Sequence, residues 1–351
     1  MQTLTVEAVD PRSDEAFRRW FSVLTAAHPV DQPHLPPPVL TEARDDAPPP
    51  DDPYDRWHHL VAVAGGESVG AARIELTSDS PNLAYFELVV RPDQRRRGIG
   101  SALLAGVESW VLGSGRAVAL SETRRPFQDE REGGAGPDGG AAFAERHGYR
   151  AGPVSVLRTL DLPVAEQRLA AADPGPVPGY RVVTWTDRCP EELLEARAAL
   201  NTEMSTDDPA AGTHRQAEVW DGARVRAYED RSISHGRRKL CAGAVHERTG
   251  ELVAATVIAG VGAQRTHVHQ WGTVVGRKHR GHRLGMLVKV ANLRHLASAW
   301  PEARQISSWN GDANASMIAI NAALGYRVVG DGTDWEKVLG SSPSVGERVR
   351  R

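Results

Sequence analysis

Three landmarks of this 351-residue chain occur twice in the same order, and this repeat limits the possible folds more than any other feature. The second set follows the first by 177 to 185 residues, so the spacing of the landmarks is nearly the same in both halves. A chain of this length also exceeds the usual size of one domain. Two copies of a single domain are therefore predicted. The matched segments are "GESVGAARI" (66–74) with "GELVAATVI" (250–258), "RRRGIGSALL" (95–104) with "RGHRLGMLVK" (280–289), and Gly148-Tyr149 with Gly325-Tyr326.

The order of strand-like and helix-like segments is the same in each repeat. An opening strand and a helix are followed by a polar stretch, a β-hairpin, an apolar strand and a glycine-containing loop. Residues 100–115 and 285–300 then place apolar side chains three and four apart, which is typical of helices. This order predicts an α+β fold of two domains, each a mixed, mainly antiparallel sheet flanked by helices. We expect an N-terminal domain at 1–162, a linker at 163–178, a C-terminal domain at 179–339 and a disordered tail at 340–351.

Composition excludes several classes of protein. The net charge is −3, so no overall basic field favours nucleic acid or an anionic membrane as a partner. Cys189 and Cys241 are too few for a disulfide framework or a cysteine-rich zinc site, although one bridge between them stays open. The first residues do not form a signal peptide, and no apolar run reaches the length of a membrane span. We expect a cytoplasmic monomer or homodimer without a metal ion.

The segment "RPDQRRRGIGSALL" (91–104) places three arginines directly before two glycines, between a predicted strand and a predicted helix. Glycine lets backbone N–H groups approach an anion, and a helix N-terminus adds partial positive charge. The spacing matches neither a P-loop nor the dinucleotide-binding fingerprint. Taken alone, the loop is either a phosphate site or a solvated basic turn.

The pattern Arg95-x-x-Gly98-x-Gly100, preceded by "LVVRP" (88–92), resembles the signature of the GCN5-related N-acetyltransferase (GNAT) superfamily. The second repeat contributes "HRGHRLG" (279–285), "WNGDAN" (309–314) and "MIAINAALGY" (317–326). The resemblance covers nearly the whole chain and implies acetyl-CoA as co-substrate, with its diphosphate on the loop. The implied cofactor-binding residues are Leu88, Val89, Val90, Arg95, Arg96, Arg97, Gly98, Ile99, Gly100 and Ser101 in the first repeat, and Val274, Val275, Arg280, Gly281, His282, Arg283, Leu284, Gly285, Asn310 and Asn314 in the second.

The resemblance also implies catalytic positions. Backbone N–H groups at Val90 or Val275 would stabilise the oxyanion that forms on the thioester. Glu87 stands where family members often place a general base, although an outward-facing strand residue explains it equally. The family's tyrosine acid corresponds to Ala144 in the first repeat and to Asn321 in the second. Asn321 can donate a hydrogen bond but cannot act as an acid at neutral pH.

The two repeats depart from the family in opposite ways. The first keeps both loop glycines but has Pro137 at the position of a cofactor-contacting asparagine, where the second has Asn314. The second has Arg283 in place of the first loop glycine, and Gly272 where the first repeat has Glu87. Which repeat is catalytic stays open.

Three carboxylates follow the first helix of the second repeat, in "LNTEMSTDDP" (200–209). Glu203, Asp207 and Asp208 would attract a cationic acceptor there, although they equally fit a solvated helix end with Arg224 and Arg226 as ion-pair partners. The sequence thus predicts an N-acetyltransferase that moves acetyl from acetyl-CoA to the primary amine of a small molecule by direct attack on the thioester. The alternative is an acyl-CoA-binding sensor or scaffold in which one or both domains are inactive.

Overall fold

The computed structural model describes residues 3–45, 47–48, 52–127, 139–207, 214–261 and 264–340. The first repeat contains β1 (Leu4–Val9), α1 (Asp14–Asp31), α2 (Leu40–Asp45), β2 (Asp55–Ala64), β3 (Glu67–Thr77), β4 (Leu83–Val90), α3 (Ile99–Gly113), β5 (Val118–Pro126), α4 (Gly139–Arg146) and β6 (Arg150–Asp161). Helix α5 (Glu166–Ala172) connects it to the second repeat. The second repeat contains β7 (Tyr180–Thr186), α6 (Leu194–Asp207), α7 (Gly222–Ser234), β8 (Arg237–His246), β9 (Leu252–Val261), β10 (His267–Val275), α8 (Leu284–Ala299), β11 (Gln305–Gly311), α9 (Ala315–Leu324) and β12 (Arg327–Val338).

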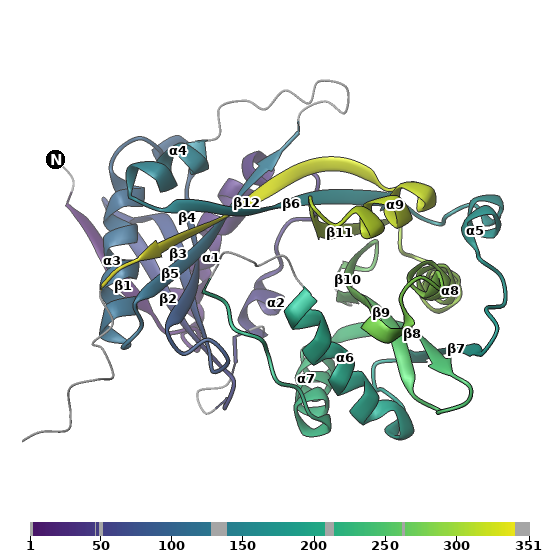
Figure 1. Ribbon diagram of the computed structural model, residues 1–351. Coiled ribbons are helices and arrows are strands. Elements are labelled where there is room, and N and C mark those ends of the chain that lie inside the picture. Colours follow the sequence, from purple (N-terminus) through teal and green to yellow (C-terminus); the bar gives the residue numbers. More distant parts are fainter. Residues whose placement is uncertain are drawn as a thin grey trace, which may run out of the picture.

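The twelve strands of the described residues form one hydrogen-bonded sheet in the order β1-β2-β3-β4-β5-β12-β6-β11-β10-β9-β8-β7. The last strand of each repeat is exchanged, because β12 pairs with β5 and β6 pairs with β11. Strands β6 and β12 also pair antiparallel with each other and run across the molecule between the two lobes (Figure 1). The predicted α+β fold with mixed sheets is confirmed, and the exchange makes the two sheets continuous.

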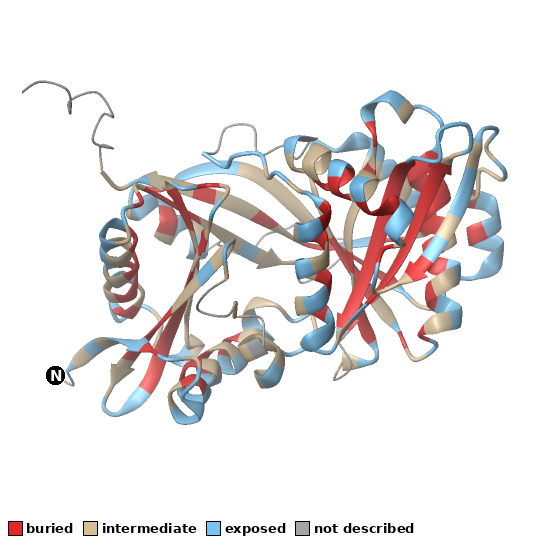
Figure 2. Ribbon diagram, turned by 90° about the horizontal axis from the view of Figure 1, so that it is seen from below, coloured by how far each residue is buried: buried red, intermediate tan, exposed pale blue. Residues whose placement is uncertain are grey.

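Helices cover both faces of the sheet in each lobe. In the first lobe, α3 places Leu103 and Val107 against one face and α1 places Phe17 and Val23 against the other. In the second lobe, α8 covers one face while α6 and α7 cover the opposite one. Buried residues accordingly gather in the central strands of each lobe (Figure 2). Alternating side chains along each strand supply the two cores.

The segment 163–178, predicted as a linker, contains helix α5, and its Leu169 and Ala172 are buried in the core of the second lobe. Helices α2 and α7 lie in stretches where the sequence indicated only polar connections.

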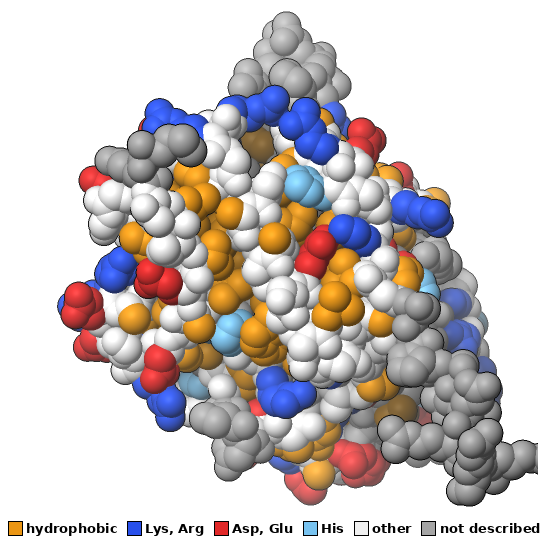
Figure 3. Space-filling view, turned by 90° about the vertical axis from the view of Figure 1, so that its left-hand side faces the viewer, with side chains coloured by type: hydrophobic (Ala, Val, Ile, Leu, Met, Phe, Trp, Pro, Cys, Tyr) orange, Lys and Arg blue, Asp and Glu red, His pale blue; other side chains and the backbone are white. Residues whose placement is uncertain are grey.

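No helix among the described residues has the length and apolar character to cross a bilayer. At the end of the molecule formed by the first lobe, acidic and basic side chains are interspersed (Figure 3).

Candidate active site

The two basic loops have the same backbone conformation although their glycines stand at different positions. The first loop adopts the left-handed conformation at Arg96 (φ 65°) and Gly98 (φ 83°), and the second at Gly281 (φ 84°) and Arg283 (φ 59°). Each loop therefore has two left-handed residues, of which one is glycine and the other arginine. A non-glycine residue in this conformation costs roughly 1–2 kcal/mol. Arg283 stands in place of the first loop glycine, and it adopts the left-handed conformation that Gly98 has in the first loop.

The first arginine of each loop holds the loop to the strand before it. The Nε atom of Arg95 donates to the carbonyl of Val90 at 3.0 Å, and that of Arg280 donates to the carbonyl of Val275 at 3.2 Å. Arg95 also donates to both carboxylate oxygens of Asp31, at 2.8 and 2.7 Å. The charge of Arg95 is therefore compensated within the protein, which makes the first loop less suited to a diphosphate.

Strand β10 contains a β-bulge. Gln270 pairs with Ile258 and Thr273 pairs with Thr256, so two residues of β10 lie opposite the single residue Val257. The side-chain amide of Gln270 donates to the carbonyl of Val257 at 2.7 Å and stabilises the bulge. A bulge leaves backbone groups unpaired and bends its strand. Strands β10 and β11 pair in parallel only at 267–270 and 305–308, and they diverge beyond the bulge.

The corresponding gap in the first repeat is bridged by side chains. Strand β4 pairs with β3 without a register shift. Across the gap from β5, the Ser121 hydroxyl donates to the carbonyl of Phe86 at 2.8 Å and Arg124 donates to Glu87 at 3.0 Å. At the loop, a ring carbon of Phe143 lies 3.2 Å from the position that a Cβ atom on Gly100 would occupy.

Glu87 is engaged by two arginines, Arg73 and Arg124, both at 3.0 Å. Burial acts to raise the pKa of its carboxyl, but the charges of these arginines outweigh burial and hold the pKa below its usual range. A carboxylate with a lowered pKa is a weaker base. The geometry therefore does not support the general-base role expected for Glu87, and it favours an ion pair that joins β3, β4 and β5.

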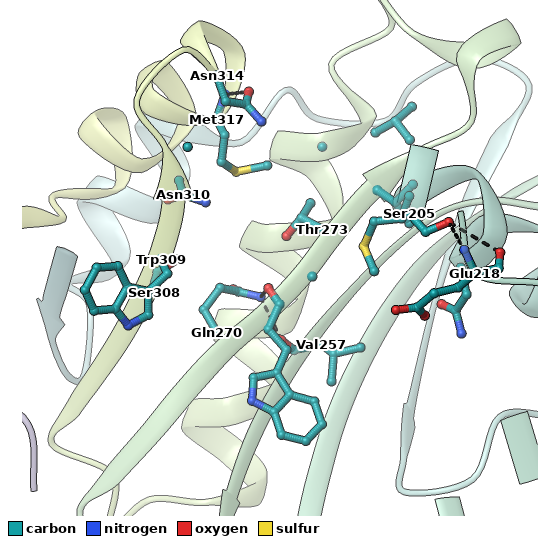
Figure 4. Close-up of a pocket in the computed structure, with 18 of the residues that line it drawn as sticks. Ser205, Glu218, Val257, Gln270, Thr273, Ser308, Trp309, Asn310, Asn314 and Met317 are labelled. Carbon is teal, nitrogen blue, oxygen red and sulfur yellow. Dashed lines mark hydrogen bonds between the residues drawn. The ribbon is translucent and has the colours of Figure 1, made fainter. Parts of the chain in front are cut away.

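A cleft of about 1440 Å³ opens where β10 and β11 diverge. This volume exceeds the roughly 300–1,000 Å³ of an ordinary small-molecule pocket. Asn310, Asn314 and Met317 lie on one side and Ser205 and Glu218 on the other, with β10 between them (Figure 4). The wall includes Val274, Val275, Arg280, Gly281, Arg283, Leu284 and Gly285 from the second set of expected cofactor-binding residues.

A buried lysine reaches the cleft wall through two asparagines. Lys289 donates from Nζ to Oδ1 of Asn321 at 2.7 Å, and Nδ2 of Asn321 donates to Oδ1 of Asn310 at 2.6 Å. Lys289 is 1% exposed and Asn321 is 0% exposed. Burial lowers the pKa of Lys289 to about 7, and the charge of Arg158 acts in the same direction. The amide of Asn321 is fully buried and orients Asn310, a geometry that gives no support to the catalytic role expected for Asn321.

Asn314 caps helix α9, because its side chain accepts a hydrogen bond from the backbone N–H of Met317 at 3.0 Å. The sequence identified Asn310 and Asn314 but missed Lys289, which reads as one polar position in an apolar helix pattern. The signal was its match to Leu104 in the first repeat, since a lysine aligned with a core leucine must find a polar partner.

The carboxylates expected to bind the acceptor lie elsewhere or outside the described side chains. Glu203 accepts a hydrogen bond from the backbone N–H of Arg277 at 2.6 Å, so it fixes the turn after β10. Asp207 ends α6 and its side chain is not among those described, and Asp208 lies outside the described residues, as does Pro137. Arg226 pairs with Glu191 and Glu229.

The first repeat supplies part of the far wall of the cleft. Arg231 of α7 pairs with Asp52 at 3.0 Å and with Asp55 at 3.1 Å. Arg224 of α7 pairs with Asp79 at 2.6 Å and lies 4.0 Å from Glu218. Each arginine therefore faces two carboxylates. The acidic character expected near the acceptor is thus present, but mostly from other residues.

Two histidines near the cleft share one serine. His267 and His269 contact the hydroxyl of Ser307 at 3.1 and 2.7 Å. Burial lowers the pKa of each histidine to about 4, so both are neutral at physiological pH.

In the described part of the chain, no group of three or more potential ligands gathers around a possible metal position. Cys189 and Cys241 are free buried thiols.

Residues 55–151 match the family model of the acetyltransferase (GNAT) domain. A solved tandem GNAT protein from the clavulanic acid biosynthesis pathway is 29% identical, with a TM-score of 0.80 over 96% of this chain and 99% of its own. A GCN5-related N-acetyltransferase from Sphaerobacter thermophilus shares the fold at 15% identity, with a TM-score of 0.60 and 96% of each chain covered.

Mycothiol acetyltransferase from Salinispora tropica is 30% identical over 182 residues, which are 51% of this chain and 49% of that protein. The corresponding protein from Parafrankia is 39% identical over 82 residues, 21% of this chain and 24% of its own length. This chain therefore spans about half or less of the curated relatives that it matches.

Residues 55–151 thus match an acetyltransferase (GNAT) domain, and nearly the whole chain is similar in sequence and fold to a tandem GNAT protein. Like that tandem protein, this chain contains two repeats, and the two repeats share one sheet.

Proposed function

We propose that the second repeat transfers an acetyl group from acetyl-CoA to the primary amine of a small molecule by direct attack on the thioester. The observation that carries this proposal is the cleft itself, which joins the loop of the second repeat to a polar chamber at α6 and α7. Its volume of about 1440 Å³ is large enough for a cofactor and an acceptor together. The diphosphate would bind the loop 280–285 and the first turn of α8, whose N–H groups have no partner within the helix.

The pantetheine arm would lie along β10 beyond its bulge, in contact with Val274 and Val275. In the first repeat, side chains from β5 bridge the gap beside the matching strand, whereas in the second repeat β10 lines the cleft on this side. A backbone N–H aimed at the thioester oxygen stabilises the negative charge that develops there. Asn310, held by Asn321 and Lys289, would contact the cofactor from the opposite wall.

The attacking amine must lose a proton, since a free alkylammonium has a pKa near 10.4. Among the described carboxylates of the cleft, Glu218 is the least tightly paired, because it lies 4.0 Å from Arg224 while Asp52, Asp55 and Asp79 are within 3.1 Å of an arginine. We assign Glu218 as the proton acceptor, directly or through water. Its replacement by glutamine should lower kcat by roughly 10²- to 10⁴-fold.

The first repeat would then serve as a structural partner, which retains part of the sensor-or-scaffold hypothesis. Its gap is bridged, its Arg95 is paired, and it contributes Asp52, Asp55 and Asp79 to the cleft of the second repeat.

Titration calorimetry with acetyl-CoA, followed by thiol release with a panel of primary amines, tests the proposal. We expect one binding site per chain and acetyl transfer that depends on Glu218. The Glu218→Gln variant should still bind acetyl-CoA. Absence of binding heat, together with empty loops in crystals soaked with acetyl-CoA, contradicts the proposal; binding without turnover of any amine supports the sensor instead.

A further inference from the structure

One face of helix α6 lines the acceptor end of the cleft, and two of its polar side chains have unused hydrogen-bonding or charge capacity. Arg197, Asn201, Met204 and Ser205 follow one another at helical spacing and all contribute to the cleft wall. Met204 packs on the β10 bulge, where its Sδ lies 2.6 Å from the position of a Cβ on Gly272. The bulge and this face of α6 are therefore in direct contact.

Arg197 is a cation without an ion-pair partner among the described residues. The other two cleft arginines of this wall, Arg224 and Arg231, are each held by carboxylates at 3.1 Å or less. A partly buried guanidinium with five donors and no ion-pair partner can bind an anion from solution.

A second cation, Lys239, lies behind the cleft wall and adds to the positive potential near Arg197. Lys239 of β8 is 5% exposed, and its Nζ lies 4.1 Å from the ring centroid of Tyr228 and 5.5 Å from that of Trp271. Both rings line the cleft. The positive charge behind these rings raises the potential at the same end of the cleft as Arg197.

Asn201, in contrast to Arg197, has an acceptor atom that lacks a hydrogen-bond donor within the described ranges. It is 9% exposed, lines the cleft, and its buried Oδ1 has no hydrogen-bond partner in the described part of the protein. Leaving such an acceptor unpaired costs about 1–3 kcal/mol, so a ligand donor is the natural partner. Four residues of helix separate Asn201 from Arg197, which corresponds to about 6 Å along the axis.

We infer, on the basis of the proposed function, that the acceptor is a small amino compound that also carries an anionic group, most simply a carboxylate. Its anion binds Arg197, and its amine donates to Asn201 on the side that faces the thioester. Four carboxylates face the two arginines Arg224 and Arg231 and would attract the amine end, so the chamber suits a molecule with charges of both signs. A neutral or purely cationic amine would leave Arg197 unpaired.

Matched acceptors test this inference: 4-aminobutyrate, 4-aminobutanamide and butylamine, together with the same three compounds at neighbouring chain lengths. We expect the amino acid of the best length to exceed its amide and alkylamine in kcat/KM by about 10- to 100-fold, the range for a hydrogen-bonded charge pair. Arg197→Gln should remove that advantage through KM and leave the neutral amines within about twofold. Asn201→Ala should weaken the charged and the neutral amines alike.

Arg248→Gln is the matched control, because this exposed arginine lies in the turn between β8 and β9. It should leave all three acceptors unchanged. Equal kcat/KM for amino acid and amide, or an Arg197→Gln variant that weakens both equally, overturns the inference while acetyl transfer itself stands. Calorimetry of the amino acids with the free protein decides the anion site even if acetyl-CoA fails to bind, in which case the proposed function falls separately.

Discussion

Replacing Lys289 by leucine should stabilise the protein at neutral pH. Burial lowers the pKa of the ammonium group to about 7 from an ordinary value of 10.5, with the charge of Arg158 contributing. At about 1.4 kcal/mol for each pH unit between the two values, this difference destabilises the folded state by about 5 kcal/mol at pH 7. Leucine already occupies the matching core position of the first repeat, as Leu104, so an apolar side chain suits this place in the fold.

The substitution also has a cost, because Oδ1 of Asn321 loses its donor. An unpaired buried acceptor destabilises by about 2 kcal/mol. The variant should therefore unfold with a free energy about 3 kcal/mol higher than the wild type at pH 7.

The sign of this difference should change with pH. Lys289 has a lower pKa in the folded state, so between pH 7 and 10.5 the unfolded chain binds more protons and wild-type stability rises with pH. The penalty of the lysine then fades, whereas the unpaired asparagine remains. We expect equal stability near pH 9 and a variant about 2 kcal/mol less stable than the wild type near pH 10.5.

Urea unfolding followed by tryptophan fluorescence at pH 7, 8, 9 and 10 measures these differences. Combining the change with Asn321→Ala is the control, since it removes the unpaired acceptor and should leave only the pH-dependent part. A variant that is less stable at pH 7, or a difference that stays constant with pH, would refute a neutralised buried lysine. Loss of the contact to Asn321 should also raise the KM for acetyl-CoA, because Asn310 is then free to turn.

Three further outcomes are expected. Gly281→Ala and Gly98→Ala each place a side chain on a left-handed residue, so they should strain the two loops to a similar degree. Only Gly281→Ala should weaken acetyl-CoA binding in calorimetry, by about tenfold. Equal weakening by both variants would place the cofactor in both loops. Glu87→Gln should leave kcat within about twofold in the thiol-release assay and lower the melting temperature, whereas a loss of about a hundredfold would restore its role as a base. His59 is 1% exposed, and burial, followed by the charges of Arg73 and His58, lowers its pKa to about 3. Stability should therefore fall as pH drops below 6.5, and His59→Leu should reduce that slope by about 1.4 kcal/mol per pH unit in urea unfolding, which a parallel shift of both curves would contradict.

Several parts of the site could be read from residues alone. Basic residues and glycines between an apolar strand and an apolar helix predict each loop, and both loops lie between such a strand and helix in the structure. Asn314 was identified by its distance from Gly325 and does line the cleft. The ion pairs that speak against Glu87 as a base could not be read from the sequence, because Arg73 and Arg124 lie 14 and 37 residues away in the chain and meet Glu87 only in the sheet.

The sequence by itself determined the repeat, the α+β class and the two basic loops, because these depend on local periodicity and on short-range turn chemistry. Only the tertiary structure decided that the repeats exchange their last strands, that side chains bridge the gap of the first repeat, and that the first repeat completes the cleft of the second. These features arise from pairings between residues far apart in the chain, and a one-residue change of register or one cross-strand ion pair is enough to open or close a site.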